Sequence, residues 1–534
     1  MTYEEKYLRI QNGSDIRGCA VAAEKEEQTF TPEMAVYIAQ GFAEFLGDKE
    51  GRDPGSLRIG VGRDSRITGK EFENAAAAGL AAAGARVYIC GIASTPAMFQ
   101  STVLADSHFD AAIMITASHL PFNRNGMKFF TREGSLSKKE ISEVLRRGAV
   151  LDEDHADRGA AAEGSDRTGG LGPEPEPFDI ISVYAKSLRE LIKREVDSEV
   201  YDKPLAGLHI VVDAGNGAAG FFPGMVLERL GADVSGSTCL EPDGMFPNHV
   251  PNPENEEAME ALRKAVLSSG ADLGVIFDCD GDRGAVMLPD GTEVNRNTLI
   301  AMLSSIVAEK HPGSVIVTDS ITSDELTDFL EKDLGLRHFR YKRGYKNVID
   351  KGRELNTMGD DCELAIETSG HAAFRENYFS DDGAYLCVKI ICRLAVLRRE
   401  GKDLSELIAG LSQPVEAVEI RYDIAEEEGD GRDYKEYGTW LLASFREYAA
   451  ADSRFRIVEP NYEGIRITFD DEEVKGWLLM RKSLHDPVIP MNIESSVPGG
   501  IDIIYGRIRH QVVTRGGFRF HPDPGGAFGA IRVN

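Results

Sequence analysis

273-LGVIFDCDGD-282 joins an apolar run to a loop that carries three aspartates on alternate positions, Asp278, Asp280 and Asp282. A short apolar run that ends in a Gly- and Asp-rich loop is typical of a buried strand in an α/β sheet. This rhythm of strand, polar loop and helical pattern predicts an α/β fold, because it recurs along the chain in 86-RVYICGI-92, 111-AAIMITAS-118, 208-LHIVVDAGNG-217 and 314-SVIVTDS-320.

The three aspartates predict a cation site. In a tight loop with permissive glycines the carboxylates converge, and their mutual repulsion favours a hard divalent ion between them, Mg²⁺ above all. An EF-hand loop is excluded because Arg283 and Pro289 stand where that loop requires Gly and Glu. Two other interpretations stay open at this point: a haloacid-dehalogenase-type phosphatase with Asp278 as nucleophile and Asp280 as acid/base, and a solvated acidic turn.

Composition limits the possible partners and surroundings. The chain has 534 residues, a length that argues for three or four domains. Its formal net charge of −28 and pI near 4.9 argue against binding to nucleic acid or to an anionic membrane. Neither a signal peptide nor a run of membrane-spanning length is visible, so we expect a cytoplasmic protein. The seven scattered cysteines lack a CxxC pair and fit free thiols better than disulfides or zinc.

Changes in composition suggest domain boundaries. Residues from about 151 to 177 are rich in Asp, Glu, Gly and Pro, as in an exposed insertion or linker, and polar acidic sequence replaces the α/β rhythm near residue 413. The Ala-rich stretch 71–85 predicts a helix that packs closely on a sheet. We therefore predict four domains, at residues 1–200 (with the insertion), 201–308, 309–412 and 413–534.

A second loop carries a candidate nucleophile. In 116-TASHLPFNRNGMKFF-130, Ser118 follows a predicted strand, with His119 beside it and Lys128 across an Asn-Gly turn. A hydroxyl nucleophile needs such a base or cation to activate it. For an isolated Ser-His pair, however, a capping serine is the default interpretation.

Four motifs, taken together, resemble those of one family. TASHLP is similar to the phosphoserine loop TASHNP of the α-D-phosphohexomutase superfamily, which includes the phosphomannomutases and phosphoglucomutases, and DCDGDR is similar to its metal loop. The stretch 367-ETSGH-371 resembles its sugar-binding loop, and 481-RKSLHDP-487 its phosphate-binding loop. The likeness runs from Asp15 to Pro487, with further matches in 15-DIRG-18, 62-GRDSR-66, 242-PDGMFPNHVPNPE-254 and 343-RGYK-346.

The resemblance implies a fold and an activity. The fold would be three similar mixed α/β sandwich domains and a smaller α+β C-terminal domain around a central cleft. The activity would be the interconversion of hexose 1-phosphate and hexose 6-phosphate, with glucose or mannose as the sugar, through a phosphoserine and a bisphosphate intermediate. One Mg²⁺ would be the cofactor and hexose 1,6-bisphosphate the activator, in a monomer or homodimer whose partner is a small sugar phosphate.

The same resemblance implies the site residues. The catalytic residues would be Ser118, Lys128, Arg17 and His119, and the metal ligands Ser118, Asp278, Asp280 and Asp282. Substrate contacts would come from Arg283, Arg343, Gly344, Tyr345, Lys346, Glu367, Ser369 and His371. The far phosphate would be bound by Arg481, Ser483 and His485.

Some positions depart from the family pattern. Leu120 replaces the Asn of TASHNP, His485 and Asp486 alter the phosphate loop, and the chain continues beyond the usual end after Glu494. Two alternatives to a glucose or mannose phosphate mutase therefore stay open: a phosphoglucosamine mutase, and a sugar-phosphate-binding regulatory protein that has lost turnover.

Overall fold

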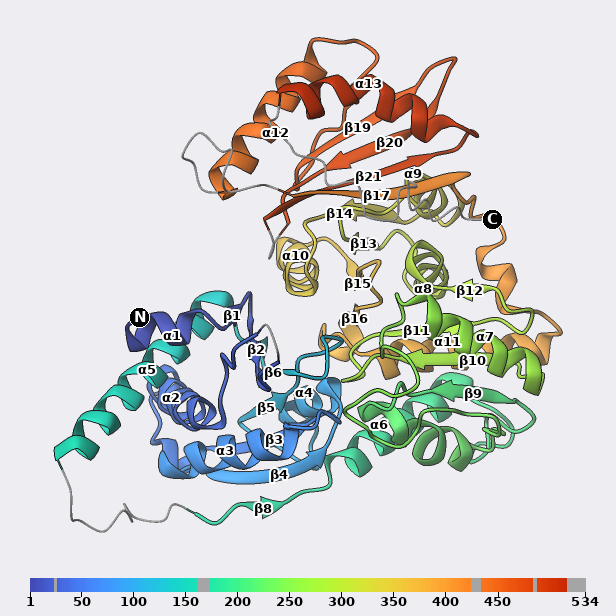
Figure 1. Ribbon diagram of the computed structural model, residues 1–534. Helices are drawn as coiled ribbons and strands as arrows, with labels where there is room; N and C mark the ends of the chain where they lie inside the picture. Colours follow the sequence, from blue (N-terminus) through green and yellow to red (C-terminus); the bar gives the residue numbers. More distant parts are fainter. Residues whose placement is uncertain (24–25, 162–172, 424–433, 484–486, 516–534) are drawn as a thin grey trace. The chain divides into compact units, whose positions relative to one another are not determined.

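The computed structural model describes residues 1–23, 26–161, 173–423, 434–483 and 487–515. The chain forms two compact units: unit 1 contains Met1–Ile306 and Ser369–Glu406, and unit 2 contains Val307–Thr368 and the described chain from Leu407 onward. Each unit contains β-sheets covered by helices, so the predicted α/β class is confirmed (Figure 1). Within the described ranges, no helix combines the length and the apolar character needed to cross a membrane.

The first sheet of unit 1 is mixed and has the strand order β1-β2-β6-β5-β3-β4-β8, with β7 paired to β6. β3 is parallel to β4 and β5, whereas β6 is antiparallel to both β5 and β2. An apolar core packs these strands against the helices. The elements are α1 (Tyr3–Leu8), β1 (Gln11–Asn12), β2 (Asp15–Cys19), α2 (Pro32–Glu50), β3 (Arg58–Arg63), α3 (Gly69–Ala82), β4 (Arg86–Ile92), α4 (Thr95–Val103), β5 (Ala111–Ile115), β6 (Arg124–Thr131), β7 (Gly134–Ser135), α5 (Lys138–Ala161) and β8 (Glu176–Pro177).

The Ala-rich stretch forms α3, as predicted from its small residues. α3 packs against α2 so closely that a Cβ atom added at Gly79 would lie 1.9 Å from the carbonyl oxygen of Val36. Only glycine fits there, since any side chain would push the two helices apart. The small residues of α3 therefore set the distance between the two helices.

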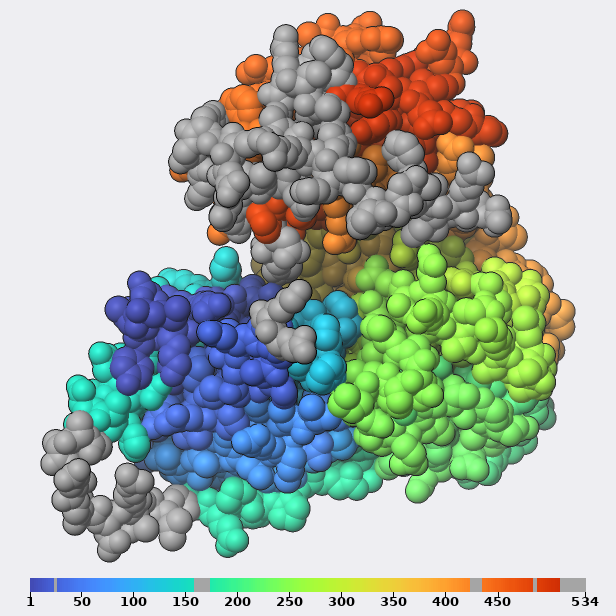
Figure 2. Space-filling model, viewed as in Figure 1, coloured from blue at the N-terminus to red at the C-terminus, as the bar shows by residue number. Residues whose placement is uncertain are grey.

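α5 extends into the stretch that was expected to be an exposed insertion. The helix continues to Ala161, and residues 153–157 are exposed on it. Asp152 is an exception, because it is buried and accepts a hydrogen bond from the Tyr7 hydroxyl at 3.0 Å. α5 packs beside α1 at the surface of unit 1 (Figure 2). Residues 162–172 of the expected insertion lie outside the described residues, and the part up to Ala161 is helical because Ala, Glu and Arg are good helix formers.

The second sheet of unit 1 has the order β12-β11-β10-β9. β9 and β10 are parallel, and β10 and β11 form an antiparallel hairpin whose loop is the aspartate loop. α7 and α11 pack on this sheet. The elements, with the others of unit 1, are α6 (Ile180–Val196), β9 (Ile210–Asp213), α7 (Glu256–Ser269), β10 (Leu273–Phe277), β11 (Gly284–Met287), β12 (Glu293–Val294), α8 (Arg296–Lys310, which runs into unit 2), β16 (Ala372–Phe374) and α11 (Gly383–Glu400).

The prediction that a helix follows each apolar run is wrong for 111–118 and 273–282. β5 is followed by β6, and β10 by β11. In both cases the residues beyond the loop are apolar and pair back in register, Ile115 with Met127 and Phe277 with Gly284. The two loops that carry candidate chemistry therefore each connect antiparallel strands.

Unit 2 contains a parallel arrangement β14-β13-β15 and a separate five-stranded antiparallel sheet with the order β17-β21-β20-β19-β18. The runs expected as strands at 464–470 and 476–483 form β19 and most of β20. The elements are β13 (Val315–Thr318), α9 (Asp324–Asp328), β14 (Arg337–Arg340), α10 (Tyr345–Met358), β15 (Cys362–Ile366), β17 (Glu416–Asp423), α12 (Tyr434–Ala450), β18 (Arg456–Ile457), β19 (Ile465–Asp470), β20 (Lys475–Met480), β21 (Val488–Ser495) and α13 (Gly500–Arg515).

A buried arginine connects the five-stranded sheet to the loop after β13. The guanidinium of Arg466 lies 3.8 Å from the ring centroid of Trp477 and donates to the carbonyl oxygens of Ser320 at 3.1 Å and Thr322 at 3.0 Å. It also pairs with Asp324 at 2.9 Å. The planar guanidinium can stack and donate at the same time, which a lysine cannot do.

The stability of this sheet should depend on pH through Glu494. Burial raises the pKa of Glu494 from 4.5 to about 8, although Arg466 opposes the shift. The folded state therefore holds a proton that the unfolded state releases between those pH values, and stability falls as pH rises through them. We expect the thermal midpoint of this sheet to decrease from about pH 5 to about pH 8, and Glu494→Gln to flatten that dependence. The exposed control Glu472→Gln should keep the wild-type slope; an equal flattening in the control would contradict the assignment.

Candidate active site

Ser118 is buried in the loop after β5 and lies against the aspartate loop. Its Oγ is 3.2 Å from Oδ2 of Asp278 and 3.3 Å from Nδ1 of His119, and its backbone N–H donates to the Thr116 hydroxyl at 2.8 Å. The φ angle of Ser118 is 52°, in the left-handed region that non-glycine residues rarely adopt. Such strained residues concentrate at functional sites, where the surrounding structure holds them in place.

Arg66 holds the serine loop. Its guanidinium donates to the carbonyl oxygens of Ser118 and Leu120, each at 2.5 Å, and to those of Pro121 and Arg124 at 2.7 and 3.0 Å. The sequence did not predict Arg66 as a site residue, although it lies in 62-GRDSR-66, one of the stretches that resemble the family. The carbonyl oxygens that Arg66 binds belong to the backbone, so no side-chain pattern in the loop reveals this contact.

We expect Arg66→Met to loosen the serine loop. The change removes four donated hydrogen bonds and leaves Asp64, 3.3 Å from Arg66 Nε, without its buried counter-charge. Breaking a buried pair in this way costs about 3 kcal/mol, and misplacement of the nucleophile should reduce turnover about 10²-fold. Thermal unfolding and a steady-state assay measure the two effects. The exposed Arg146→Met, which loses only its pair with Glu4, should change stability by less than about 1 kcal/mol.

The three aspartates converge, as predicted. Asp278, Asp280 and Asp282 are fully buried in the hairpin loop between β10 and β11, and each places one carboxylate oxygen within 4.8 Å of the others. Gly281 takes a φ of 72°, which lets the loop turn tightly. The alternative that this loop is only a solvated acidic turn is wrong, because none of the three aspartate side chains is exposed to solvent.

Two buried cations balance part of the negative charge of the three carboxylates. Arg283 donates from Nε and its backbone N–H to the two oxygens of Asp278 at 3.0 and 3.2 Å, while Lys128 Nζ lies 3.0 Å from Asp280 and 2.5 Å from Asp282. Burial and then the charge of Asp282 raise the pKa of Asp278 well above its usual value, against Arg283. Although burial acts in the opposite direction, Lys128 holds the pKa of Asp280 below its usual value.

The cluster has the donor set of a divalent-cation site. Oδ1 of Asp280 and Oδ1 of Asp282 are buried and accept no hydrogen bond in this structure. Buried carboxylate oxygens without donors are costly unless a cation binds them, and oxygen ligands of this kind suit Mg²⁺. Thr95 donates to Oδ2 of Asp280 at 2.5 Å and so orients that carboxylate, a contact that the sequence did not indicate.

Burial lowers the pKa of both histidines of the site. Burial and then Arg283 lower the pKa of His119 to about 2, and the same causes lower the pKa of His371 well below its usual value. Nδ1 of His371 forms a 2.9 Å hydrogen bond with Ser369 Oγ, and its Nε2 lies 3.7 Å from Oδ1 of Asp282. His119 can orient the Ser118 hydroxyl, but such a low pKa makes it a weak base.

Arg17 lies on β2, next to β6, which carries Lys128. Its guanidinium pairs with Asp15 at 2.9 Å. It also lines a pocket of about 530 Å³ together with Arg9, Arg124 and two glutamates. Arg124 pairs with Glu26 across this pocket, so its lining carries both charges and Arg17 contributes one of its cations.

In unit 2 the predicted sugar-binding residues gather at the start of α10. The backbone N–H of Gly344, whose φ is 106°, donates to Oε1 of Glu367 at 2.6 Å, and Arg343 Nε lies 3.5 Å from Asp319. Tyr345 begins the helix, and Lys346 pairs with Asp350 at 3.0 Å on its surface. Glu367 belongs to unit 2, whose first segment ends at Thr368, whereas Ser369 and His371 belong to unit 1.

The predicted phosphate-binding residues of unit 2 lie at the end of β20. Arg481 is buried, and burial and then the charge of Arg343 lower its pKa. The backbone N–H of Ser483 donates to the Val488 carbonyl at 3.0 Å. Glu463, which the sequence did not indicate, accepts from the Arg343 backbone N–H at 3.2 Å. His485 lies outside the described residues.

Models of three protein domains match most of the chain. Residues 9–150, 182–291 and 295–415 match, in order, the phosphoglucomutase/phosphomannomutase alpha/beta/alpha domains I, II and III.

Individual relatives match over nearly the full length. A phosphomannomutase/phosphoglucomutase of Pseudomonas aeruginosa is 28% identical over 508 residues, 93% of this chain and 94% of the relative. A phosphoglucomutase/phosphomannomutase of Thermococcus kodakarensis is 31% identical over 465 residues, 86% and 90% of the two chains. The crystal structure of a phosphoglucomutase/phosphomannomutase family protein from Burkholderia thailandensis superposes with a TM-score of 0.74 at 26% identity, covering 96% of this chain and 98% of its own.

Proposed function

Because the chain belongs to the phosphoglucomutase/phosphomannomutase family and is a phosphohexomutase, we propose that Ser118 carries the phosphoryl group that is exchanged with the sugar. The observation that supports this most directly is the 3.2 Å distance between Ser118 Oγ and Asp278 in the aspartate cluster. A hydroxyl at this place can hold a phosphoryl group next to a bound cation. The glucose and mannose 1- and 6-phosphates are the proposed substrates.

Asp278, Asp280, Asp282 and an oxygen of phospho-Ser118 would hold the ion, which we take to be one Mg²⁺. When bound, it supplies positive charge that stabilises the transferring phosphoryl group. The side chains already in place set the geometry around it: Arg283 fixes Asp278, and Thr95 fixes Asp280. The serine itself is fixed through its backbone by Arg66.

Two cations of the chain would act on the reacting hydroxyl and phosphate. Lys128 lies within 3.0 Å of two aspartates in this structure, so ion binding by these carboxylates would free its ammonium group to turn toward the sugar. There it would either accept the hydroxyl proton or orient the hydroxyl electrostatically. Arg17, on the adjacent strand, would bind phosphate oxygens with its planar guanidinium.

The other end of the substrate would be bound by the remaining predicted residues. Glu367 would accept hydrogen bonds from two sugar hydroxyls, with Ser369, His371 and the segment Arg343–Gly344–Tyr345–Lys346 as further contacts. Arg481, Ser483 and His485 would bind the phosphate that does not react.

The proposed cycle conserves both phosphoryl groups. Ser118 gives its phosphoryl group to a hydroxyl of the sugar monophosphate, whose proton leaves to a neighbouring base, and a bisphosphate forms. The bisphosphate then reverses its orientation in the site, so that its other phosphoryl group lies next to Ser118 and is transferred back to it. Added hexose 1,6-bisphosphate would activate the enzyme by phosphorylating Ser118. A cytoplasmic location, and a monomeric or homodimeric state, remain predictions.

A coupled assay tests this proposal. Glucose 1-phosphate, mannose 1-phosphate and glucosamine 1-phosphate are each supplied with Mg²⁺ and a trace of glucose 1,6-bisphosphate. Formation of the 6-phosphate of glucose or mannose supports the proposal and identifies the preferred sugar. Turnover of glucosamine 1-phosphate alone would point to the phosphoglucosamine branch. Release of inorganic phosphate, or binding of the sugar phosphate without any turnover, would contradict the mutase proposal.

A further inference from the structure

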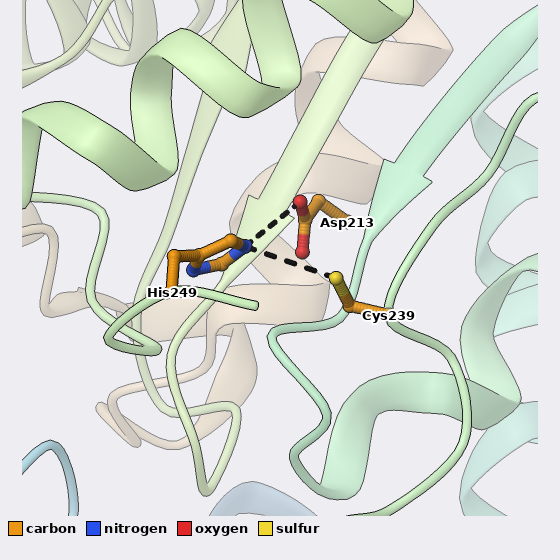
Figure 3. A group of neighbouring side chains, drawn as sticks. All are labelled: Asp213, Cys239 and His249. Carbon is orange, nitrogen blue, oxygen red and sulfur yellow. Dashed lines mark hydrogen bonds and ion pairs between the residues drawn. The ribbon is translucent and has the colours of Figure 1, made fainter. Parts of the chain in front are cut away.

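A second cluster of metal-ligating side chains lies in unit 1, outside the site described above. Asp213 ends β9, and Cys239 and His249 come from the irregular chain that follows (Figure 3). One ring nitrogen of His249, Nε2, lies 3.0 Å from Oδ2 of Asp213 and 3.9 Å from Sγ of Cys239. The ligand atoms of the three residues lie within 4.8 Å of one another.

Both ring nitrogens of His249 face acceptor oxygens, so a proton or a cation is needed at Nε2 as well as at Nδ1. Nδ1 lies 3.0 Å from the Val250 carbonyl oxygen, which only accepts, so Nδ1 carries a proton. In a neutral ring, Nε2 then has a lone pair, yet it faces a carboxylate oxygen, another acceptor. The Cys239 thiol, 3.9 Å from Nε2, can donate to this lone pair. The 3.0 Å contact between Nε2 and Oδ2 of Asp213 still joins two acceptors, and it requires a second proton or a metal ion between them.

Neighbouring groups fix each side chain in the way that metal ligands are usually fixed. The Val250 carbonyl sets the tautomer of His249 so that Nε2 faces the cluster. Oδ1 of Asp213 accepts from the Gly215 backbone N–H at 2.9 Å, and Oδ2 accepts from the Thr238 hydroxyl at 3.2 Å. Cys239 has a φ of 53°, a left-handed conformation that turns its side chain toward the other two.

We propose that Asp213, Cys239 and His249 bind one borderline divalent cation such as Zn²⁺, with water as the fourth ligand. Tetrahedral zinc with O, N and S ligands separates the ligand atoms by roughly 3.4 to 3.6 Å. The present separations of 3.0 and 3.9 Å differ from those values by a few tenths of an ångström. Binding would release the Cys239 thiol proton, and any proton on Nε2, to solvent.

The ligand atoms of this site differ from those of the aspartate cluster, and so does the metal ion that they favour. Thiolate and imidazole favour Zn²⁺ and Co²⁺, whereas three carboxylates favour Mg²⁺. The spacing of the cysteines did not indicate zinc, because the site uses one cysteine together with a histidine and an aspartate distant from it in sequence. Asp213 and His249 are buried and Cys239 is partly exposed, so an ion can enter from the thiol side.

Co²⁺ is the probe that tests this proposal, because a thiolate ligand gives it a charge-transfer absorption that carboxylates do not give. The full-length protein is titrated with Co²⁺ in excess Mg²⁺, which occupies the aspartate cluster. We expect one equivalent of Co²⁺ to produce the thiolate band. Cys239→Ser should abolish the band, and His249→Gln should weaken binding by at least about 10-fold. The partly exposed Cys90→Ser is the matched control and should keep both band and affinity.

Alkylation gives a second readout in the unmodified chain. Zn²⁺ should slow modification of Cys239 by an alkylating reagent and leave the rate at Cys90 unchanged, as measured by mass spectrometry of the two peptides. Absence of the thiolate band in the wild type, its persistence in Cys239→Ser, or equal alkylation rates with and without Zn²⁺ would show that the cluster is only a protonated histidine paired with Asp213. None of these outcomes depends on mutase activity.

Discussion

Ser118→Ala is expected to reduce mutase turnover by at least about 10⁴-fold, because the reaction then lacks the oxygen that carries the phosphoryl group. The fold should survive, since the Ser118 hydroxyl forms hydrogen bonds with Asp278 and His119 among the described residues, and the hydrogen bonds of its backbone remain. A coupled assay measures turnover. Mass spectrometry after incubation with glucose 1,6-bisphosphate measures phosphorylation of the peptide that contains Ser118.

Ser107→Ala is the matched control for this experiment. Ser107 is also buried, but among the described residues its hydroxyl donates to the backbone carbonyls of Ser101 at 2.8 Å and Leu104 at 3.3 Å rather than to the aspartate loop. It should keep full turnover and a phosphorylated Ser118. Turnover that persists in Ser118→Ala, or a phosphoryl group found elsewhere, would refute the assignment of the nucleophile.

The same experiment separates the mutase from the phosphatase interpretation of the FDCDG segment. A phosphatase would use Asp278 as its nucleophile and would not need Ser118. In the structure, however, both oxygens of Asp278 accept from Arg283, and Ser118 Oγ adds a further contact to Oδ2. A carboxylate bound in this way is held as a ligand rather than exposed for attack.

The sequence predicted the local chemistry better than the connections between elements. The aspartate and serine loops were identified because alternating carboxylates and a strand-end serine are visible as residue types. The hairpin after β10 was missed because a buried strand and a buried helix segment of similar length have the same apolar pattern. Whether a strand or a helix follows Arg283 depends on pairing between residues that are not adjacent in sequence. Here Val286 pairs with Val275, and a strand forms.

Residues that act on backbone atoms were also missed. Arg66 binds four carbonyl oxygens, and Glu463 accepts from the backbone N–H of Arg343; no pattern of side chains records such partners. Thr95 was missed because it reaches Asp280 from a helix 185 residues away in sequence. These contacts depend on the tertiary fold, so only the coordinates reveal them.

Asp280→Asn is expected to weaken Mg²⁺ binding and to reduce turnover by about 10³-fold. The amide keeps the volume of the side chain and one acceptor oxygen but removes the charge that Lys128 and the ion share. Its NH₂ group would also face either Lys128 Nζ, now 3.0 Å from Oδ2, or the position of Oδ1, which accepts no hydrogen bond at present. An amide donor at either place opposes a cation.

Isothermal titration with Mg²⁺ and the coupled assay measure these two losses. Because the variant loses affinity for the ion, excess Mg²⁺ should restore part of the turnover, which a general loss of folding would not allow. Asp290→Asn is the control: Asp290 lies beyond β11 at an exposed turn, where its carboxylate accepts from the Thr292 backbone N–H at 2.9 Å. If both variants bound Mg²⁺ as the wild type does, the ion would have to bind elsewhere, and the buried carboxylate oxygens of the hairpin loop would need another explanation.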